Sequence, residues 1–529
     1  MKNATSSFKK SLLTLSVVAS LALAGCSSTN AASSASSSIQ ASIDQGQVET
    51  VSTSSAGSIS YDTHYDSTNL NWDQSSEVTI DLANPQASQG VSVQDGVITI
   101  TAAGTYRLSG QLEDGQVRVE AGDQDTVRLV LDNASIHNSS GPALLIESAD
   151  EAIVYSQQGS TNSLSDGADY ADTSSEAADA TLFSRADLTL AGQGSLNVDA
   201  AYSDGIASRD GLTIAAGSYK VVAKNHGIKG KDYVDIISGK IQVEAAEGDG
   251  IKATNADDQE RGWLRLISGQ LEISAADDAL KAERELEILA GEVKINSATE
   301  GIEGQHIMIS AGNISVQASE DAMNATIPSD SSSETEEGTE TENTDQAGQQ
   351  PAPSEGAEMP TDTGFVPGGM PGGMPGQGGM EEAVDASIKI SGGNISLTTS
   401  AGDGFDSNGT AEISGGNLTV NGPSAGGNGV FDTVGDFTIS DATVIAGGTA
   451  DMFVAPTLAK GAYLLTKDLT VTEADEITVE DANGQQVASY RVSAEGAQLF
   501  YVSSGNLVAG QTYTVKVNGQ QQASLQAQS

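Results

Sequence analysis

Acidic residues recur at one place in a repeated sequence, two positions before an apolar residue. In residues 276–297, ADDALKAERELEILAGEVKINS, Asp278 precedes Leu280, and in the next 22 residues Glu300 precedes Ile302. Successive repeats carry at this place Asp204, His226, Asp249, Asp278, Glu300, Asp321 and Asp403. If the repeats stack as strands of a sheet, these side chains form a column with a spacing of about 4.8 Å. Carboxylates at that spacing repel one another, so the column would have raised pKa values or would bind a cation.

Calcium suits such a column because it accepts about six to eight oxygen ligands, including carboxylates, in a flexible geometry. We therefore expect calcium ligands among the acidic members, Asp204, Asp249, Asp278, Glu300, Asp321 and Asp403. An alternative stays open, because Asp before Gly is common at tight turns, where the carboxylate bonds nearby backbone without any ion.

Three lysines form a parallel set one place after the apolar residue of their repeats, namely Lys229, Lys252 and Lys281. They would either neutralise the acids by Asp-to-Lys pairing or contact an anionic ligand such as an acidic polysaccharide. Pairing is the favoured interpretation, and carbohydrate binding by these lysines is the alternative.

The elements that would position these residues are short strands. From residue 202 the chain divides into six rows, five of them 22 residues long, and each has alternating apolar runs around a Gly. Period-two alternation with Val and Ile indicates half-buried strands, and a fixed period of this length indicates a solenoid. No row has the spacing of a leucine-rich repeat. We predict an all-β protein, a parallel β-helix with about 22 residues per coil, whose core ladder is Ile206, Ile228, Ile251, Leu280 and Ile302.

The N-terminus predicts export and a lipid anchor. Lys9 and Lys10 precede the apolar run SLLTLSVVASLALA, and LAGC follows, so residues 1–25 are typical of a secretory signal peptide. LAGC resembles the bacterial lipobox, in which Cys26 receives diacylglycerol. Residues 26–74 are rich in Ser, Ala and Gln and are expected to form a flexible tether. The expected location is the bacterial cell surface, outside the cytoplasm, with membrane contact through the lipid alone.

Composition divides the rest of the chain. The β-helix is expected over 75–325 and 385–455, separated by an acidic and Gly/Pro/Met-rich insertion over 326–384 that cannot bury enough apolar surface to order itself. Residues 456–529 are expected to form a small antiparallel β cap, with turns at two Asn-Gly pairs.

The chain has 72 acidic and 24 basic residues, a net charge of −48, which argues against nucleic-acid binding. We expect a monomer.

Three stretches carry a family resemblance: VITITAAGTYRLSGQLEDGQVRVEA, STNSLSDG, and GNGVFDTVGDFTISDATVIAGGTADMF. With the D-G-I repeats between them, they resemble the secreted carbohydrate-binding β-helix family typified by a clostridial protein that binds cellulose and acidic sugars. The resemblance spans roughly residues 75–525. It implies a right-handed parallel β-helix with calcium bound by acidic corner residues, related in shape to pectate lyases, that binds polysaccharide such as polygalacturonate. His226, and Ala279 and Ala322 in place of the corner Gly, depart from that pattern.

Three functions remain open at this level. The favoured one is non-catalytic binding of polysaccharide, an acidic glycan or cellulose, with Trp263 as a sugar-stacking platform; a buried ring that anchors the neighbouring loop is the alternative for Trp263. The second is a calcium-dependent lyase with one of the three lysines as base. The third is a structural or adhesive stalk that binds no glycan.

Overall fold

A computed structural model describes residues 60–327, 382–423, 426–493 and 497–529. The signal peptide, Cys26, most of the tether and residues 328–381 of the insertion lie outside the described residues. Helix in the described part is confined to two short 3-10 helices, η1 (Ser67–Leu70) and η2 (Gln74–Ser76). No helix in these residues has the length and apolarity needed to span a membrane. The other regular elements of the described residues are strands, joined by turns and loops.

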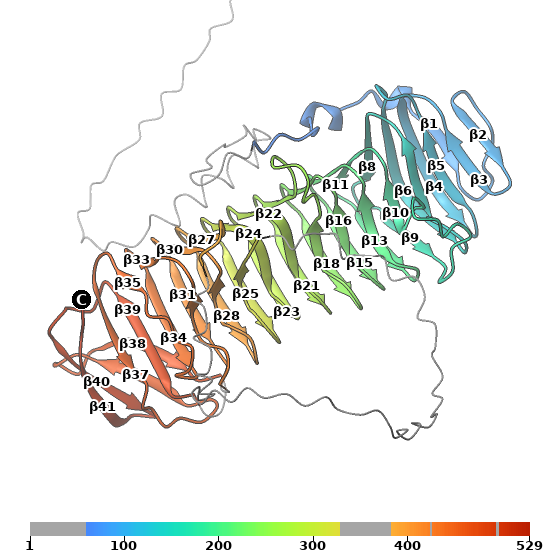
Figure 1. Cartoon of the computed structure of the whole chain (residues 1–529). Coiled ribbons are helices and arrows are strands. Elements are labelled where there is room, and N and C mark those ends of the chain that lie inside the picture. Colours follow the sequence, from blue (N-terminus) through green and yellow to red (C-terminus); the bar gives the residue numbers. More distant parts are fainter. Residues whose placement is uncertain (1–59, 328–381, 424–425, 494–496) are drawn as a thin grey trace, which may run out of the picture.

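The strands stack as the coils of a parallel β-helix, in three parallel ladders that run the length of the molecule (Figure 1). One coil is β13, β14 and β15, after which β16 starts the next coil directly beside β13.

Ladder 1 contains β3 (Val97–Ile100), β5 (Gln116–Glu120), β7 (Leu144–Ser148), β10 (Ala180–Ser184), β13 (Asp204–Ser208), β16 (Ile228–Gly230), β19 (Ile251–Ala253), the first parts of β22 (Leu280–Ile288) and β24 (Ile302–Ile309), β26 (Asn324–Ala325), β29 (Asp406–Ser407) and β32 (Asp432–Thr433). Ladder 2 contains β1 (Val78–Asp81), β4 (Gly104–Leu112), β6 (Thr126–Asn138), β8 (Glu151–Ser156), β11 (Asp187–Gly192), β14 (Gly211–Ile214), β17 (Tyr233–Ile236), β20 (Trp263–Leu266), the second parts of β22 and β24, β27 (Ser387–Ile390), β30 (Thr410–Ile413), β33 (Phe437–Ile439) and β35 (Thr457–Leu458). Ladder 3 contains the ends of β4 and β6, then β9 (Thr161–Asp166), β12 (Ser195–Ala200), β15 (Ser218–Ala223), β18 (Lys240–Ala245), β21 (Gln270–Ala275), β23 (Glu292–Ser297), β25 (Asn313–Ala318), β28 (Asn394–Thr399), β31 (Asn417–Asn421) and β34 (Thr443–Gly448). At the N-terminal end, β2 (Val91–Gln94) pairs antiparallel with β3.

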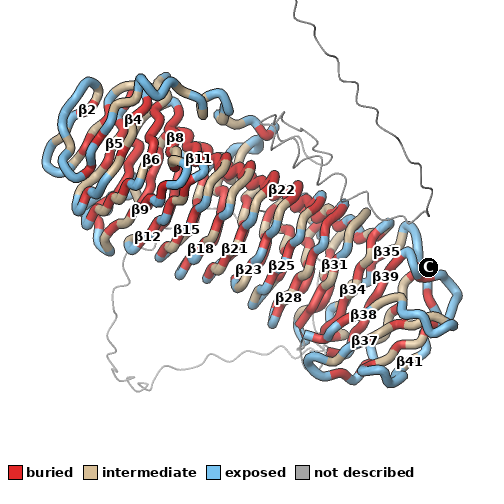
Figure 2. Tube along the Cα trace, turned by 180° about the vertical axis from the view of Figure 1, so that it is seen from behind, coloured by how far each residue is buried: buried red, intermediate tan, exposed pale blue. Residues whose placement is uncertain are grey.

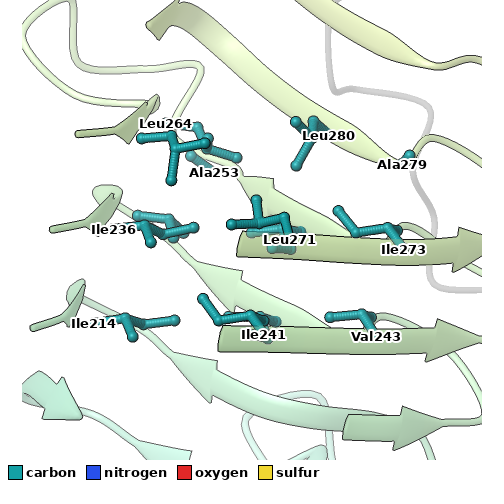
Figure 3. Packing of buried hydrophobic residues seen from close by; sticks show 14 of the residues in the cluster. Ile214, Ile236, Ile241, Val243, Ala253, Leu264, Leu271, Ile273, Ala279 and Leu280 are labelled. Atoms are coloured by element: carbon teal, nitrogen blue, oxygen red, sulfur yellow. The ribbon is translucent and has the colours of Figure 1, made fainter. Parts of the chain in front are cut away.

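The core ladder has the register that the sequence predicts. The five residues expected to stack pair in order, each with its counterpart in the next coil: Ile206, Ile228, Ile251, Leu280 and Ile302. All five are fully buried. Figure 3 shows the same stacking on the other ladders, where Ile214 lies over Ile236. Figure 2 shows the resulting pattern, with buried chain along every coil.

Glycines form the corner before ladder 3. Gly217, Gly239, Gly269, Gly291 and Gly312 all have positive φ, between 109° and 138°. A Cβ on Gly269 would also lie 2.7 Å from the backbone oxygen of Gly239 in the coil below. Backbone conformation and close stacking therefore both require Gly at this corner.

The C-terminal strands cover the end of the solenoid. They are β36 (Ala462–Thr466), β37 (Glu476–Glu480), β38 (Gln486–Arg491), β39 (Leu499–Ser504), β40 (Thr512–Val517) and β41 (Gln520–Gln526). β39 pairs antiparallel with β34, the last strand of ladder 3, so that edge is closed. The hairpin of β40 and β41 turns at Asn518 and Gly519, both with positive φ, as a two-residue Asn-Gly turn requires.

Residues 60–77, which we call the strap, lie along the outer face of ladder 2 (Figure 1, the blue segment before β1). Tyr61 contacts Trp263 of β20, and Trp72 contacts Tyr155 of β8. The sequence analysis assigned residues up to 74 to the flexible tether. The strap differs from that expectation because its aromatic rings and Leu70 pack on apolar residues of distant coils.

Candidate functional site

The residue after each core residue of ladder 1 points outward, and these residues form what we call the outer column. In register, from the N-terminal end, the column reads Arg118, Leu145, Phe183, Ala207, Lys229, Lys252, Lys281, Glu303, Asn324, Asp406 and Asp432. The three predicted lysines are therefore neighbours in the middle of the column. Beyond them the same position carries carboxylates, so the charge of the column changes sign along the molecule.

The acidic residues predicted as calcium ligands, which we call the corner column, stand next to it. The backbone at this corner is hydrogen-bonded from coil to coil. The amide of Gly250, next to Asp249, donates to Asp278 O, and the amide of Gly301, next to Glu300, donates to Asp321 O. The structure thus brings Asp204, Asp249, Asp278, Glu300, Asp321 and Asp403 into one column, interrupted by His226. Whether they bind calcium stays a prediction.

The lysines pair with the corner column. Lys252 Nζ lies 2.8 Å from Asp249 Oδ2. Lys281 Nζ lies 2.8 Å from Asp278 Oδ2 and 2.9 Å from Glu303 Oε2. The pairing interpretation of the lysines is therefore confirmed.

Lys229 pairs across coils. Its own corner position holds His226, which offers no carboxylate, and Lys229 instead contacts Asp204 of the preceding coil and lies 3.2 Å from Asp179. Burial acts to lower the pKa of Lys229, but the carboxylates of Asp204 and Asp179 outweigh it, so the pKa is raised.

The corner carboxylates also bond backbone, but it is the backbone of the next coil and not that of their own turn. Asp249 Oδ1 accepts the amide of Asp278 at 3.0 Å, and Asp321 Oδ1 accepts the amide of Asp403 at 2.6 Å. Asp204 Oδ1 accepts the amide of His226 at 3.1 Å. Each of these acids thus holds the next coil in place, whatever else it binds.

Electrostatics divide the corner column into two halves. Burial acts to raise the pKa of Asp204 and Asp249, but in both cases a lysine and His226 outweigh burial, and the pKa is lowered. Burial of Asp278, with the nearby carboxylate of Glu303, raises the pKa of Asp278 to about 8, even though Lys281 acts to lower it. The carboxylates of Asp278 and Glu303 thus share the single ammonium group of Lys281.

The C-terminal half has raised pKa values throughout. Burial and neighbouring carboxylates raise the pKa of Glu300 to about 7, of Asp403 to about 6 and of Asp406 to about 8. Among the described residues, no Lys or Arg forms an ion pair with any of these three groups. This is the result expected for stacked acids without a counter-ion.

Within the part of the chain that the structure describes, two groups of carboxylates lie close enough together to hold a metal ion. In each group the ligand oxygens lie within 4.8 Å of one another: Asp249, Asp277 and Asp278 in one, and Asp278, Glu300 and Glu303 in the other. The donor set, all carboxylate oxygen, fits calcium. In the second group the ammonium of Lys281 already lies against Asp278 and Glu303, so calcium there would compete with Lys281.

Several members of this acidic region were missed by the sequence analysis. Glu303, Asp406 and Asp432 stand one place after a core residue, the position at which only lysines were collected. Extending that count through the later rows would have found them. Asp277 precedes Asp278 and joins the first group because both side chains reach the same corner.

A groove of about 530 Å³ opens on the outer face of ladder 1 at its N-terminal end, and we call it the ladder 1 groove. Its polar lining includes Gln116, Arg118, Asn138, Glu147, Tyr170 and Arg185. Arg185 Nε lies 3.2 Å from Glu147 Oε1. Tyr170 is stacked on Tyr202, with ring centroids 3.9 Å apart. None of the predicted site residues lines this groove, because it is built from the irregular coils before residue 202.

Trp263, the predicted sugar platform, is fully buried. Its ring is stacked on Tyr233, with centroids 4.7 Å apart, and Tyr61 of the strap meets it edge-on at 5.0 Å. The ring lies on the outer face of ladder 2, so it is the strap that covers it. As the described residues lie, Trp263 is not exposed to a ligand.

The chain is similar to a carbohydrate-binding domain-containing protein from Acetivibrio thermocellus. The two are 30% identical over 218 residues, which is 41% of this chain and 76% of that protein. The chain belongs to the family of carbohydrate-binding domain-containing proteins. The family model of the same description matches residues 94–347, which include the three lysines, Trp263 and the corner column up to Asp321.

The chain is also similar to a solved structure, which is described as the polysaccharide lyase-like protein from C. thermocellum in a gadolinium derivative. The two chains are 30% identical, with a TM-score of 0.39, over 43% of this chain and 96% of that chain.

Proposed function

We propose that this protein binds polysaccharide at a bacterial cell surface, held there by the lipid on Cys26, and that it does so without catalysis. The polysaccharide is an acidic glycan such as polygalacturonate. The observation that carries the proposal is the ladder 1 groove, whose guanidinium, amide, carboxylate and phenol groups are those that hold sugars.

The groove offers two kinds of contact to a uronate chain. Asn138 and Gln116 supply amide groups that both donate and accept hydrogen bonds, which suits sugar hydroxyls. Arg118 and Arg185 supply planar guanidinium groups, which match a carboxylate in a bidentate geometry. Asp95, Asp114, Glu147 and Asp172 also line the groove. Arg118 already pairs with Glu120 at 2.7 Å and Arg185 with Glu147 at 3.2 Å, so a glycan carboxylate would compete with these acids for the guanidinium groups.

Calcium at the corner column would supply further positive charge. Burial, and after it neighbouring carboxylates, raises the pKa values of Glu300, Asp403 and Asp406, and a divalent cation would compensate their charges. We propose Asp278, Glu300 and Glu303 as its ligands, because their oxygens lie closest together in that part of the column. When bound, calcium would bridge protein carboxylates to those of the glycan.

The lysines support a binding function over a lyase. A lyase base must be able to lose its proton at working pH. Burial acts to lower the pKa of Lys281, but Asp278 and Glu303 outweigh it and the pKa is raised, as it is for Lys229. Both lysines are therefore protonated and paired, which suits neutralisation of the column.

The test is retention of the mature chain, residues 27–529, on immobilised polygalacturonate and on cellulose, with calcium and then with EGTA. We expect retention on polygalacturonate that weakens in EGTA, with no ultraviolet absorbance from an unsaturated uronate product. Release of that product would establish a lyase. Absence of retention on both polymers in both buffers would leave a structural stalk.

A further inference from the structure

Charged residues are buried on the outer face of ladder 2, where a solenoid normally exposes them to water. They belong to strands from β6 to β22 and are Arg128, Glu151, Asp187, Asp235, Arg265, Glu285 and Glu287, each at most 9% exposed. Their strand neighbours, such as Leu264 and Leu266, point into the core instead. Because charged side chains are rarely buried without a cause, the cover over them requires an explanation.

The strap is that cover, and it contacts the face through polar groups. The Tyr61 hydroxyl donates to Glu285 at 2.8 Å, and Asn69 Nδ2 donates to Glu151 at 3.0 Å. His64 Nδ1 contacts Asp187. The strap adds no strand to the sheet, because the backbone of ladder 2 is already paired from coil to coil.

An aromatic surface lies under the strap. Tyr233 and Trp263 are parallel, with an interplanar angle of 8°, and Arg265 beside them forms two hydrogen bonds of 2.9 Å with Asp235. The indole Nε1–H of Trp263 is buried and has no hydrogen-bond acceptor among the described residues. A buried donor without an acceptor is rare. With the strap in place, the Trp263 indole is therefore a free donor that could bind an acceptor on a ligand.

The same face continues past the start of the strap. The column that contains Asp235, Arg265 and Glu287 runs on in register through Met308 and Lys389. A cavity of about 160 Å³ is lined there by Glu287, Met308, Lys389 and Glu412, and no strap residue contributes to its lining. Of the described residues, the strap therefore covers this face up to Glu287 and leaves the cavity beyond it open.

We propose that the outer face of ladder 2 is a second saccharide-binding groove, and that the strap masks its aromatic part. A polysaccharide chain would contact the outward edges of the stacked Tyr233 and Trp263 rings and exchange hydrogen bonds with the Trp263 indole and with Glu285 and Glu287. Aromatic rings flanked by carboxylates and a guanidinium offer the contacts that suit sugar rings and hydroxyls. The inference rests on the proposed function, and it makes the N-terminal segment a regulator of binding.

The test uses residues 27–529 with Trp72→Phe, so that Trp263 is the single tryptophan. In this background, Tyr61→Ser, His64→Ser and Asn69→Ser together remove the three polar side-chain contacts of the strap with Glu285, Asp187 and Glu151. Gln74→Ser, an exposed strap position, is the matched control. We expect acrylamide quenching of Trp263 fluorescence to rise several-fold in the triple variant and to stay unchanged in the control. Polygalacturonate or cellulose oligosaccharides should then restore protection of Trp263 in the triple variant.

Two outcomes overturn the inference. One is a triple variant in which Trp263 stays protected without sugar, because the strap would then be a fixed part of the fold. The other is an exposed Trp263 that neither kind of oligosaccharide protects. Retention of the unsubstituted protein on polysaccharide is measured in parallel. If the unsubstituted protein is retained while Trp263 fails these tests, only the masked groove is wrong; if neither protein binds any glycan, the proposed function itself fails.

Discussion

At the scale of single residues, the β-helix places the same kind of side chain at the same position in successive coils. In the corner column these side chains are carboxylates, which repel one another. Lys252 relieves that repulsion for Asp249, whose pKa is lowered, whereas Lys281 is shared between Asp278 and Glu303 and leaves the pKa of Asp278 raised. Glu300, Asp403 and Asp406 have no such relief, and their pKa values are raised. In the corner column, Asp204 and Asp249 are thus neutralised by lysines of the protein, whereas Glu300 and Asp403 are available to an external cation.

Lys281→Met should destabilise the protein, because it leaves Asp278 and Glu303 facing each other without the ammonium between them. We expect the free energy of unfolding to fall by about 2 kcal/mol in EDTA at pH 8, less than for a fully buried pair because Lys281 is partly exposed. Calcium should recover more stability in this variant than in the unsubstituted protein, since the competing cation is gone. Urea unfolding measures both effects. Lys294→Met, which removes an exposed ion pair with Glu272, is the control and should change nothing measurable.

Stability should fall as pH rises in metal-free buffer. The pKa of Asp406 is raised from its ordinary 3.8 to about 8, and the raised values of Glu300 and Asp403 act in the same direction. A carboxyl whose pKa is raised by folding stabilises the fold fully below its unfolded pKa and loses that contribution as pH rises through the folded pKa. Stability should therefore decrease from about pH 5 to 8.5. Asp204 and Asp249, with lowered pKa values, act only at more acidic pH.

Asp406→Asn isolates this effect. Thermal unfolding midpoints measured across that pH range should vary less in Asp406→Asn than in the unsubstituted protein, while Asp441→Asn, at an exposed ion pair, should follow the unsubstituted protein. Equal pH dependence in all three proteins would show that the stacked acids do not titrate in this range.

At the scale of elements, the corners are as constrained as the core. Gly269→Ala combines a positive φ of 119° with a Cβ 2.7 Å from the backbone of the coil below, and should cost about 3 kcal/mol of stability. Gly484→Ala also has positive φ but open space around its Cβ, and should cost about 1 kcal/mol. Urea unfolding of the two variants separates stacking from backbone strain. Equal losses would mean that the glycine corner before ladder 3 is not tightly stacked.

The sequence predicts the elements that repeat and misses those that do not. The register of Ile206 with Ile228 follows from a fixed spacing in the chain, so counting suffices. Asp406 was missed although Asp403 of the same coil was counted, because only lysines were collected at the position after the core residue. Tyr61 and Trp263 are 202 positions apart in sequence, and nothing local in either indicates that the strap crosses to β20. The ladder 1 groove likewise comes from coils of irregular length.

At the scale of the molecule, the β-helix is a rigid rod with different chemistry along its faces. On ladder 1 the outer column runs from Arg118 through the lysines to Asp432, so a glycan lying along it would meet guanidinium groups first and carboxylates last. The C-terminal strands close the edge of ladder 3, and the strap covers part of ladder 2. The ladder 1 groove, of about 530 Å³, is left open by the described residues and is larger than the cavity beside Glu287.

The most direct test of polysaccharide binding is retention of residues 27–529 on immobilised polygalacturonate, compared with the double variant Arg118→Gln and Arg185→Gln. A second double variant, Lys220→Gln and Lys294→Gln, removes the same charge from exposed positions on ladder 3. We predict that the unsubstituted protein and the lysine variant are retained and elute with salt, and that the arginine variant passes through. Equal retention of all three proteins would contradict the assignment of binding to the ladder 1 groove, and retention of none would contradict binding itself.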